Sequence, residues 1–130
     1  SPHIAGYSYE GRVRGTQMCY EAACRFFERE PTWRSSPADR PACATLHVDA
    51  CGRRAEEVLD AVVRGAYDIE ADDSALRAGL VPDDLERGRH FQKLRSQYPN
   101  RYEFAAWPVE LTGADGALAD RVRALGFRLV

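Results

Sequence analysis

The chain has 130 residues, a formal net charge of −2, and 45% hydrophobic and 29% charged residues, as in an ordinary globular domain. The small net charge argues against general binding to nucleic acid, and no apolar run approaches the roughly 18 residues of a membrane-spanning helix. No signal or transit segment is recognisable, and the sequence begins at Ser1. We therefore expect residues 1–130 to form one domain that is excised from, or processed out of, a longer chain.

The N-terminal third is expected to hold a short strand, a helix and a loop. In residues 1–14 we expect a short strand that includes Ile4, Tyr7 and Tyr9, with Gly6 and Gly11 as breakers. The segment GTQMCYEAACRFFE, residues 15–28, predicts a helix from about Gln17 to Arg29, with Thr16 as its cap and Pro31 ending it. Its predicted buried stripe is Cys19, Ala22, Ala23 and Phe26. Residues 31–42, rich in proline and serine, predict a surface loop or a lid, with Trp33 pinning it or covering a site.

The middle of the chain carries the clearest periodic patterns. Residues 44–51, ATLHVDAC, alternate in the manner of a strand, so His47 and Asp49 should share one face. Apolar residues from Ala55 to Ala66 recur at helical spacing and predict a helix over 53–66. For the acidic residues 67–84 we expect a short strand or turn around Ile69, which the sequence does not place in the fold.

The remaining segments complete an α+β architecture. A helix is expected from Asp83 or Asp84 to about Gln97, and a strand over 102–111 that Pro108 restricts to an edge or bends. A helix over 115–125 and a short strand over 127–130 follow. The sequence therefore predicts a single α+β domain with a three- to four-stranded sheet packed with about four helices.

The sharpest functional hypothesis is a cysteine nucleophile. With Thr16 as the cap, Cys19 would lie in the first helical turn, where free N–H groups and the helix dipole favour a thiolate. His47 would act as the base, Asp49 would orient it, and Gln17 would donate to an oxyanion. These residue types in these roles predict amide or acyl chemistry.

The segment GTQMCYEAA together with His47 resembles the papain-like fold of bacterial effector and toxin domains. The resemblance implies a protease, deamidase or acyltransferase that is delivered out of the producing cell. It also implies a protein of a host or competitor cell as substrate, and a cognate inhibitor protein as partner. The chain departs from the family in the short Cys19–His47 separation and in placing Asp49 on the strand of the histidine.

A second hypothesis is a nuclease-type toxin or nucleic-acid binder built on residues 86–102. This segment is basic, whereas residues 56–86 are strongly acidic. Its aromatic residues could stack on bases and its histidine could act as a general acid or base. The residues concerned are Arg87, Arg89, His90, Lys93 and Arg95. The alternative, which we favour, is an amphipathic helix whose aromatic residues face the core.

A third hypothesis is a secreted binding module without chemistry, stapled by two disulfides. The four cysteines, Cys19, Cys24, Cys43 and Cys51, allow three connectivities. Cys19 and Cys24 lie about 140° apart on a helix, so any bridge would tie that helix to the 43–51 segment. The cysteine spacings do not match the usual zinc motifs, so we expect no metal site, and nothing in the sequence calls for a cofactor.

Overall fold

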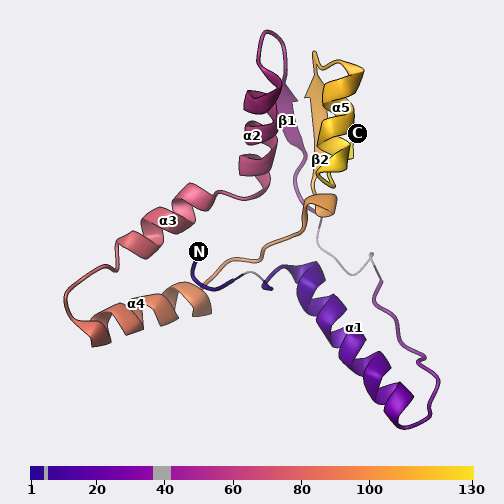
Figure 1. Cartoon of the computed structure of the whole chain (residues 1–130), viewed down its shortest axis with the longest axis vertical. Coiled ribbons are helices and arrows are strands. Elements are labelled where there is room, and N and C mark those ends of the chain that lie inside the picture. The colour runs from indigo at the N-terminus through magenta and orange to yellow at the C-terminus, as the bar shows by residue number, and fades with distance from the viewer. Residues whose placement is uncertain (5, 37–41) are drawn as a thin grey trace.

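The computed structural model describes residues 1–4, 6–36 and 42–130 of the chain (Figure 1). Within these residues the α+β class expected from the sequence is confirmed. No helix in the described part is long and apolar enough to cross a membrane. The elements in chain order are α1 (Tyr9–Phe26), β1 (Leu46–Asp49), α2 (Ala55–Ala66), α3 (Ile69–Arg77), α4 (Asp84–Ser96), the 3-10 turn η2 (Phe104–Ala106), β2 (Pro108–Thr112), α5 (Gly116–Ala124) and β3 (Arg128–Leu129).

The three strands form a parallel sheet in the order β1-β2-β3. In its register Leu46 lies opposite Val109, and Val109 lies opposite Leu129. The strand that contains Pro108 is therefore central, and the prediction of an edge strand is wrong. The sheet tolerates Pro108 because it is the first residue of β2, where a missing N–H costs least.

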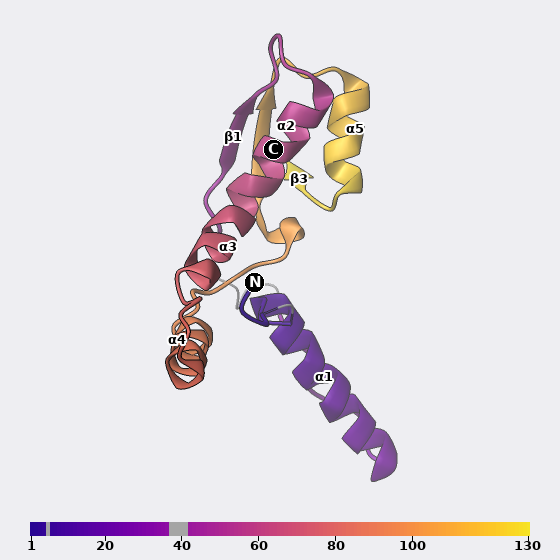
Figure 2. The same cartoon turned by 60° about the vertical axis from the view of Figure 1, so that its left-hand side comes forward.

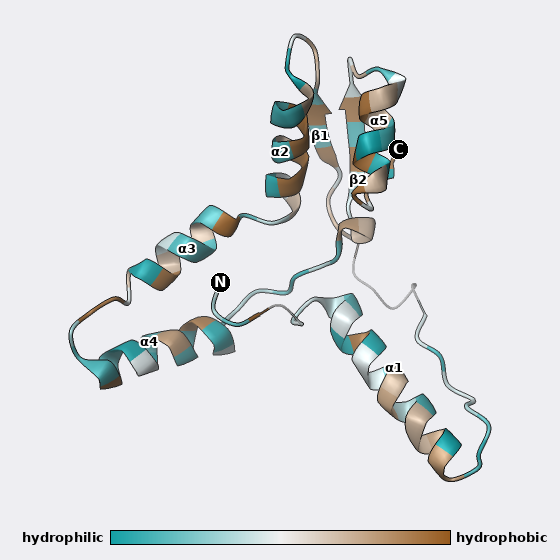
Figure 3. Ribbon diagram, viewed as in Figure 1, coloured by the Kyte–Doolittle hydropathy of each residue, from teal (hydrophilic) through white to brown (hydrophobic). Residues whose placement is uncertain are grey.

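One face of the sheet carries the core. Val62 of α2, Val109 of β2 and Val122 of α5 are each 0% exposed and pack with Phe127. A second cluster joins Val58, Ala50 and Leu118 at the carboxyl ends of the strands. Figure 3 shows the apolar stripes of α2 and α5 directed toward the sheet. The helical pattern predicted over 53–66 is thus confirmed as α2, because its stripe is what the sheet buries.

The opposite face of the sheet is polar. The side chains of His47, Asp49, Glu110 and Thr112 alternate with the core residues and are exposed. All-parallel sheets are usually covered on both faces. Here α2 and α5 both lie on the same side, so the second face is left to polar side chains.

Helix α1 differs most from the sequence-based expectation. It begins at Tyr9, with Ser8 as N-cap accepting a hydrogen bond from the amide of Gly11, so the predicted strand around Tyr7 and Tyr9 is wrong. None of its residues is buried, and Phe26 is 81% exposed. The stripe expected to be buried is instead at the surface, because α1 projects away from the sheet (Figures 1 and 2).

The segment after α1 runs back along that helix. The Tyr20 hydroxyl accepts a hydrogen bond from the amide of Thr32 at 2.9 Å, and the Ser35 hydroxyl donates to Gln17 at 2.9 Å. The ring of Trp33 packs edge-on against Tyr20, so it pins this segment to α1. The loop or lid expected over 31–42 lies in part, over residues 37–41, outside the described residues.

The region that the sequence could not place is helical. Asp68 caps α3 by accepting from the amides of Glu70 and Ala71. Helix α4 is capped by Asp83 and confirms the helix predicted from Asp83 or Asp84 to about Gln97. Together α3 and α4 form a hairpin that extends from the sheet in a different direction from α1 (Figure 1).

Candidate functional site

Cys19 does not occupy a helix N-terminus. Since α1 begins at Tyr9, Cys19 lies in its interior, where backbone N–H groups are used by the helix itself. Thr16, the expected cap, donates its hydroxyl to the carbonyl of Arg12 one turn earlier, at 3.0 Å. Gln17 donates to Glu21 at 2.8 Å. The features that were expected to activate Cys19 are therefore absent from its place in α1.

His47 and Asp49 share one sheet face, as predicted from the alternation. His47 Nδ1 lies 2.8 Å from a carboxylate oxygen of Glu110, directly opposite on β2, and both side chains are more than half exposed. Asp49 accepts from the amide of Cys51 at 3.0 Å and from Thr112 at 3.4 Å. His47 is thus paired with Glu110, and Asp49 organises the turn after β1.

The hydrogen bonds at this turn shift two ionisation equilibria in opposite directions. The amide of Cys51, followed by its thiol, holds the pKa of Asp49 below its usual value. The same carboxylate, by hydrogen bonding and by its charge, raises the pKa of the Cys51 thiol. Cys51 is therefore a less reactive thiol than an isolated cysteine.

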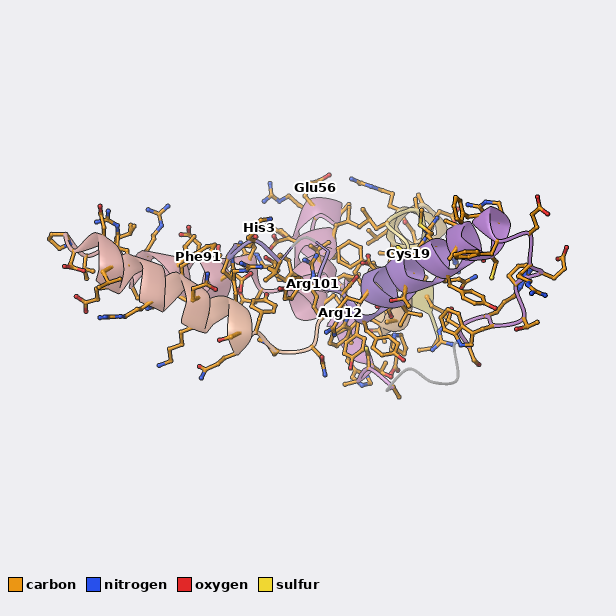
Figure 4. The ribbon with its side chains drawn as sticks, turned by 90° about the horizontal axis from the view of Figure 1, so that it is seen from below. His3, Arg12, Cys19, Glu56, Phe91 and Arg101 are labelled. Atoms are coloured by element: carbon orange, nitrogen blue, oxygen red, sulfur yellow. The ribbon has the colours of Figure 1, made fainter. Side chains whose placement is uncertain are left out.

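The structure does not bring the proposed nucleophile to the proposed base. Cys19 lies along α1 (Figure 4), whereas His47 lies on β1, and these elements project apart in both overall views. The four cysteines, all within the described residues, form no disulfide, and Cys19 and Cys51 are exposed. The described residues contain no group of three or more His, Cys, Asp or Glu side chains that could hold a metal ion.

Two of the five candidate residues on α4 are engaged in contacts within the hairpin. Arg87 donates to the carbonyl of Val81 at 2.6 Å and pairs with Asp84. His90 Nε2 lies 2.8 Å from the carbonyl of Ala75, which ties α4 to α3. Arg87 and His90 thus stabilise the α3–α4 hairpin. Arg89 and Lys93 are exposed on α4, and Arg95 contacts the Tyr7 hydroxyl at 3.3 Å.

A junction between the N-terminal segment, the hairpin and residues 98–103 was missed by sequence reasoning. At its centre the hydroxyls of Tyr67 and Tyr98 both donate to the carboxylate of Asp72, at 2.7 and 2.9 Å. Arg101 stacks over the ring of Tyr67 at 4.4 Å, and its carbonyl accepts from the amide of Tyr9 at 2.8 Å. Tyr9, Tyr98 and Arg101 lie at least 26 residues from Asp72 along the chain, so no local pattern could have grouped them with it.

The N-terminal segment at this junction contains a strained histidine. His3 has a φ of 61°, a left-handed conformation that is uncommon for a residue other than glycine. Its side chain is exposed, while Pro2 and Ile4 on either side are buried. Figure 4 places His3 between α1 and α4, in the region of Arg101. Strain of this kind persists where surrounding structure enforces it, and it is concentrated at functional sites.

An open groove of about 600 Å³ follows the side of α1. It is lined by Tyr9, Val13, Gln17, Met18 and Ser35, among others. The apolar residues at its edge and beyond are unusually exposed, with Met18 at 60% and Phe27 at 68%. Exposed apolar side chains at the groove and at the end of α1 are typical of surface that is covered by other protein.

Comparison with known proteins identifies relatives of the chain. Residues 39–126 match the family model described as "Domain of unknown function (DUF3410)". Proteins named erythronate-4-phosphate dehydrogenase match nearly the whole chain. One from Marinobacter nauticus is 36% identical over 99% of the chain, and one from Pseudomonas syringae pv. syringae is 40% identical over all of it. A third, from Pseudomonas putida strain GB-1, is 40% identical over all of the chain. Each match covers 34% of the relative, so the chain spans about a third of its relatives' length.

These relatives overturn the functional hypotheses drawn from the sequence. The resemblance to papain-like effector and toxin domains is wrong, and so is a cysteine hydrolase or transferase, because the relatives are named as dehydrogenases. The nuclease and disulfide-stapled alternatives are wrong for the same reason. Three further expectations followed from the toxin hypothesis and are corrected with it: a host or competitor-cell protein as substrate, a cognate inhibitor protein, and export from the producing cell. A bacterial source agrees with the organisms of the relatives. The resemblance misled because a Cys–His pair carries little information without the distance between them.

Proposed function

Because the chain belongs to the DUF3410 family, and its relatives of known name are dehydrogenases, we propose that it forms part of an erythronate-4-phosphate dehydrogenase. The observation that carries the proposal is the extent of the match. Three relatives with this name are 36–40% identical over 99–100% of the chain. Such an enzyme oxidises a small phosphorylated hydroxy acid.

The exposed apolar residues along α1 and at its end fit a role as a part of a larger enzyme. Met18, Phe26 and Phe27 present apolar surface that the described residues leave uncovered. The relatives are about three times as long as the chain, and we infer that their additional length supplies the surface that packs on α1. Met18→Asp should then lower the melting temperature of the full-length protein while hardly changing that of residues 1–130 alone. Equal melting shifts in both would contradict this packing.

His3 is our candidate for the proton transfer of the reaction. Oxidation of a hydroxyl to a carbonyl removes a hydride, which an acceptor such as NAD⁺ has to take, and the hydroxyl proton, which a general base has to accept. Histidine is the side chain most often used as that base. Of the three histidines, His47 is paired with Glu110 and His90 is used to close the hairpin. His3 combines an exposed imidazole with an enforced, strained backbone.

The test is an activity assay of the full-length gene product with erythronate 4-phosphate. We expect turnover of this substrate, and a loss of about 100-fold or more in kcat for His3→Gln, the range of general acid–base catalysis. His47→Gln is the matched control, because it changes an exposed histidine on the sheet and should retain activity. A folded full-length protein without turnover would refute the proposed function. Full activity of His3→Gln would refute only the role of His3.

A further inference from the structure

The α3–α4 hairpin holds together by its own contacts. His90 reaches the carbonyl of Ala75, and its ring packs so closely on Gly79 that a Cβ there would collide with it. Arg87 donates to the carbonyls of Val81 and Pro82 in the connection between the two helices. No residue of α3 or α4 is fully buried. The hairpin is therefore a self-contained unit with little buried apolar surface to fix its position.

One carboxylate of the hairpin, that of Asp72, joins it to the rest of the chain at two points. Asp72 belongs to α3, Tyr67 is the residue that ends α2, and Tyr98 follows α4. Both tyrosine hydroxyls donate to the Asp72 carboxylate, at 2.7 Å from Tyr67 and at 2.9 and 3.0 Å from Tyr98. Burial, reinforced by this hydrogen bond, raises the pKa of both phenols, so both remain donors at neutral pH.

The residues near Asp72 contact the N-terminal segment of the chain and not the sheet. Arg101 stacks on Tyr67 and pairs through its backbone with Ser8, and Arg95 reaches the hydroxyl of Tyr7. A further pair between Arg64 and Glu70, at 2.6 Å, is exposed to solvent, where ion pairs add little. Neither core cluster of the sheet includes a residue of α3 or α4. In Figure 2 the hairpin extends beyond the end of the sheet.

We propose that Asp72 is the latch of a hinged arm, and that the α3–α4 hairpin detaches as one unit while the sheet core stays folded. The hinges lie between the arm and the two tyrosines, at Asp68 before α3 and at Gln97 after α4, so Tyr67 and Tyr98 stay with the rest of the chain. Hydrogen bonds to a charged acceptor are stronger than neutral ones, so a single carboxylate can decide the closed position. Elements with few buried apolar contacts open locally at a lower free energy than the core.

The test compares Asp72→Ala and Asp72→Asn with Asp73→Asn in the full-length gene product, by hydrogen exchange measured on peptides. Asp73 is the matched control, because it is the next carboxylate on α3 and pairs only along that helix, with Arg77. For Asp72→Ala we expect exchange over residues 69–96 to accelerate about tenfold or more, as for a lost charge-assisted hydrogen bond. Exchange in α2 and α5 should not change, and Asp73→Asn should leave both regions as they are.

A second readout distinguishes a latch from general destabilisation. Asp72→Asn removes the charge that helps to hold the two phenols protonated, so alkaline titration followed by ultraviolet absorbance should show their pKa values falling toward the usual value. If the Asp72 variants fail to fold, Tyr98→Phe removes one donor and keeps the ring, and the same regional acceleration is expected. Acceleration of the hairpin and the sheet together, or of neither, would overturn the proposal.

Discussion

Replacement of Val62 tests whether the sheet and its two helices form the core of this protein. Val62 is 0% exposed and lies between β2 and α5, in contact with Val109 and Val122. Val62→Ala deletes two methyl groups, each worth about 0.8 kcal/mol of burial, and leaves a small cavity, so we expect a loss of about 2 kcal/mol. Val62→Asp places an unpaired carboxylate in the same site. That costs several kcal/mol more, enough to unfold a domain whose total stability is about 5–15 kcal/mol.

Tryptophan fluorescence offers a local assay for this prediction. Trp107 packs against the cluster that contains Val62, whereas Trp33 packs against Tyr20 of α1 and is 43% exposed. In a Trp33→Phe background, thermal unfolding seen by Trp107 should shift by about 8 °C for Val62→Ala. Ala71→Asp, which adds the same carboxylate on the exposed surface of α3, should stay within about 0.5 kcal/mol of the parent. A Val62→Asp protein that melts like the parent would refute the assignment of the core.

Three further predictions concern the polar features of the structure. Asp49 raises the pKa of the exposed Cys51 thiol, so Cys51 should react with iodoacetamide more slowly than exposed Cys19 at neutral pH. Asp49→Asn should accelerate the alkylation of Cys51. Mass spectrometry of the alkylated peptides measures both alkylation rates. Gly113 has a φ of 69° and no room for a Cβ beside Cys51. Gly113→Ala should therefore lower the free energy of unfolding by more than about 1 kcal/mol, which a thermal melt measures. Ser8→Ala removes the cap of α1 and a 2.5 Å hydrogen bond to Glu103, and should cost about 1–2 kcal/mol in urea unfolding.

Local sequence determined those elements whose pattern is complete within a few turns. The apolar spacing from Ala55 to Ala66 specified α2, and alternation specified β1 and the shared face of His47 and Asp49. Asp83 and Asp115 cap α4 and α5, because a short acidic side chain can satisfy the free amides of a helix start. In each of these cases the stabilising partner lies within a few residues, so the sequence alone carries the information.

The start of α1 depended on contacts that sequence proximity does not reveal. Ser8 and Thr16 are both suitable N-cap residues, and the sequence pattern predicted Thr16. In the structure Ser8 is 1% exposed, donates to Glu103 and lies in a β-bridge with Arg101. Those partners are more than 90 residues away along the chain. Once Ser8 is fixed by them, the helix begins there, and Cys19 falls in its interior.

The candidate sites were decided by tertiary structure for the same reason. Periodicity gives the face of an element on which a residue lies, but not which other element it meets. It could not show that Cys19 and His47 lie on elements that project apart, nor that Tyr67, Asp72 and Tyr98 converge. Such meetings depend on how whole helices and strands pack against one another, because the energy that brings them together is spread over many weak, non-directional contacts.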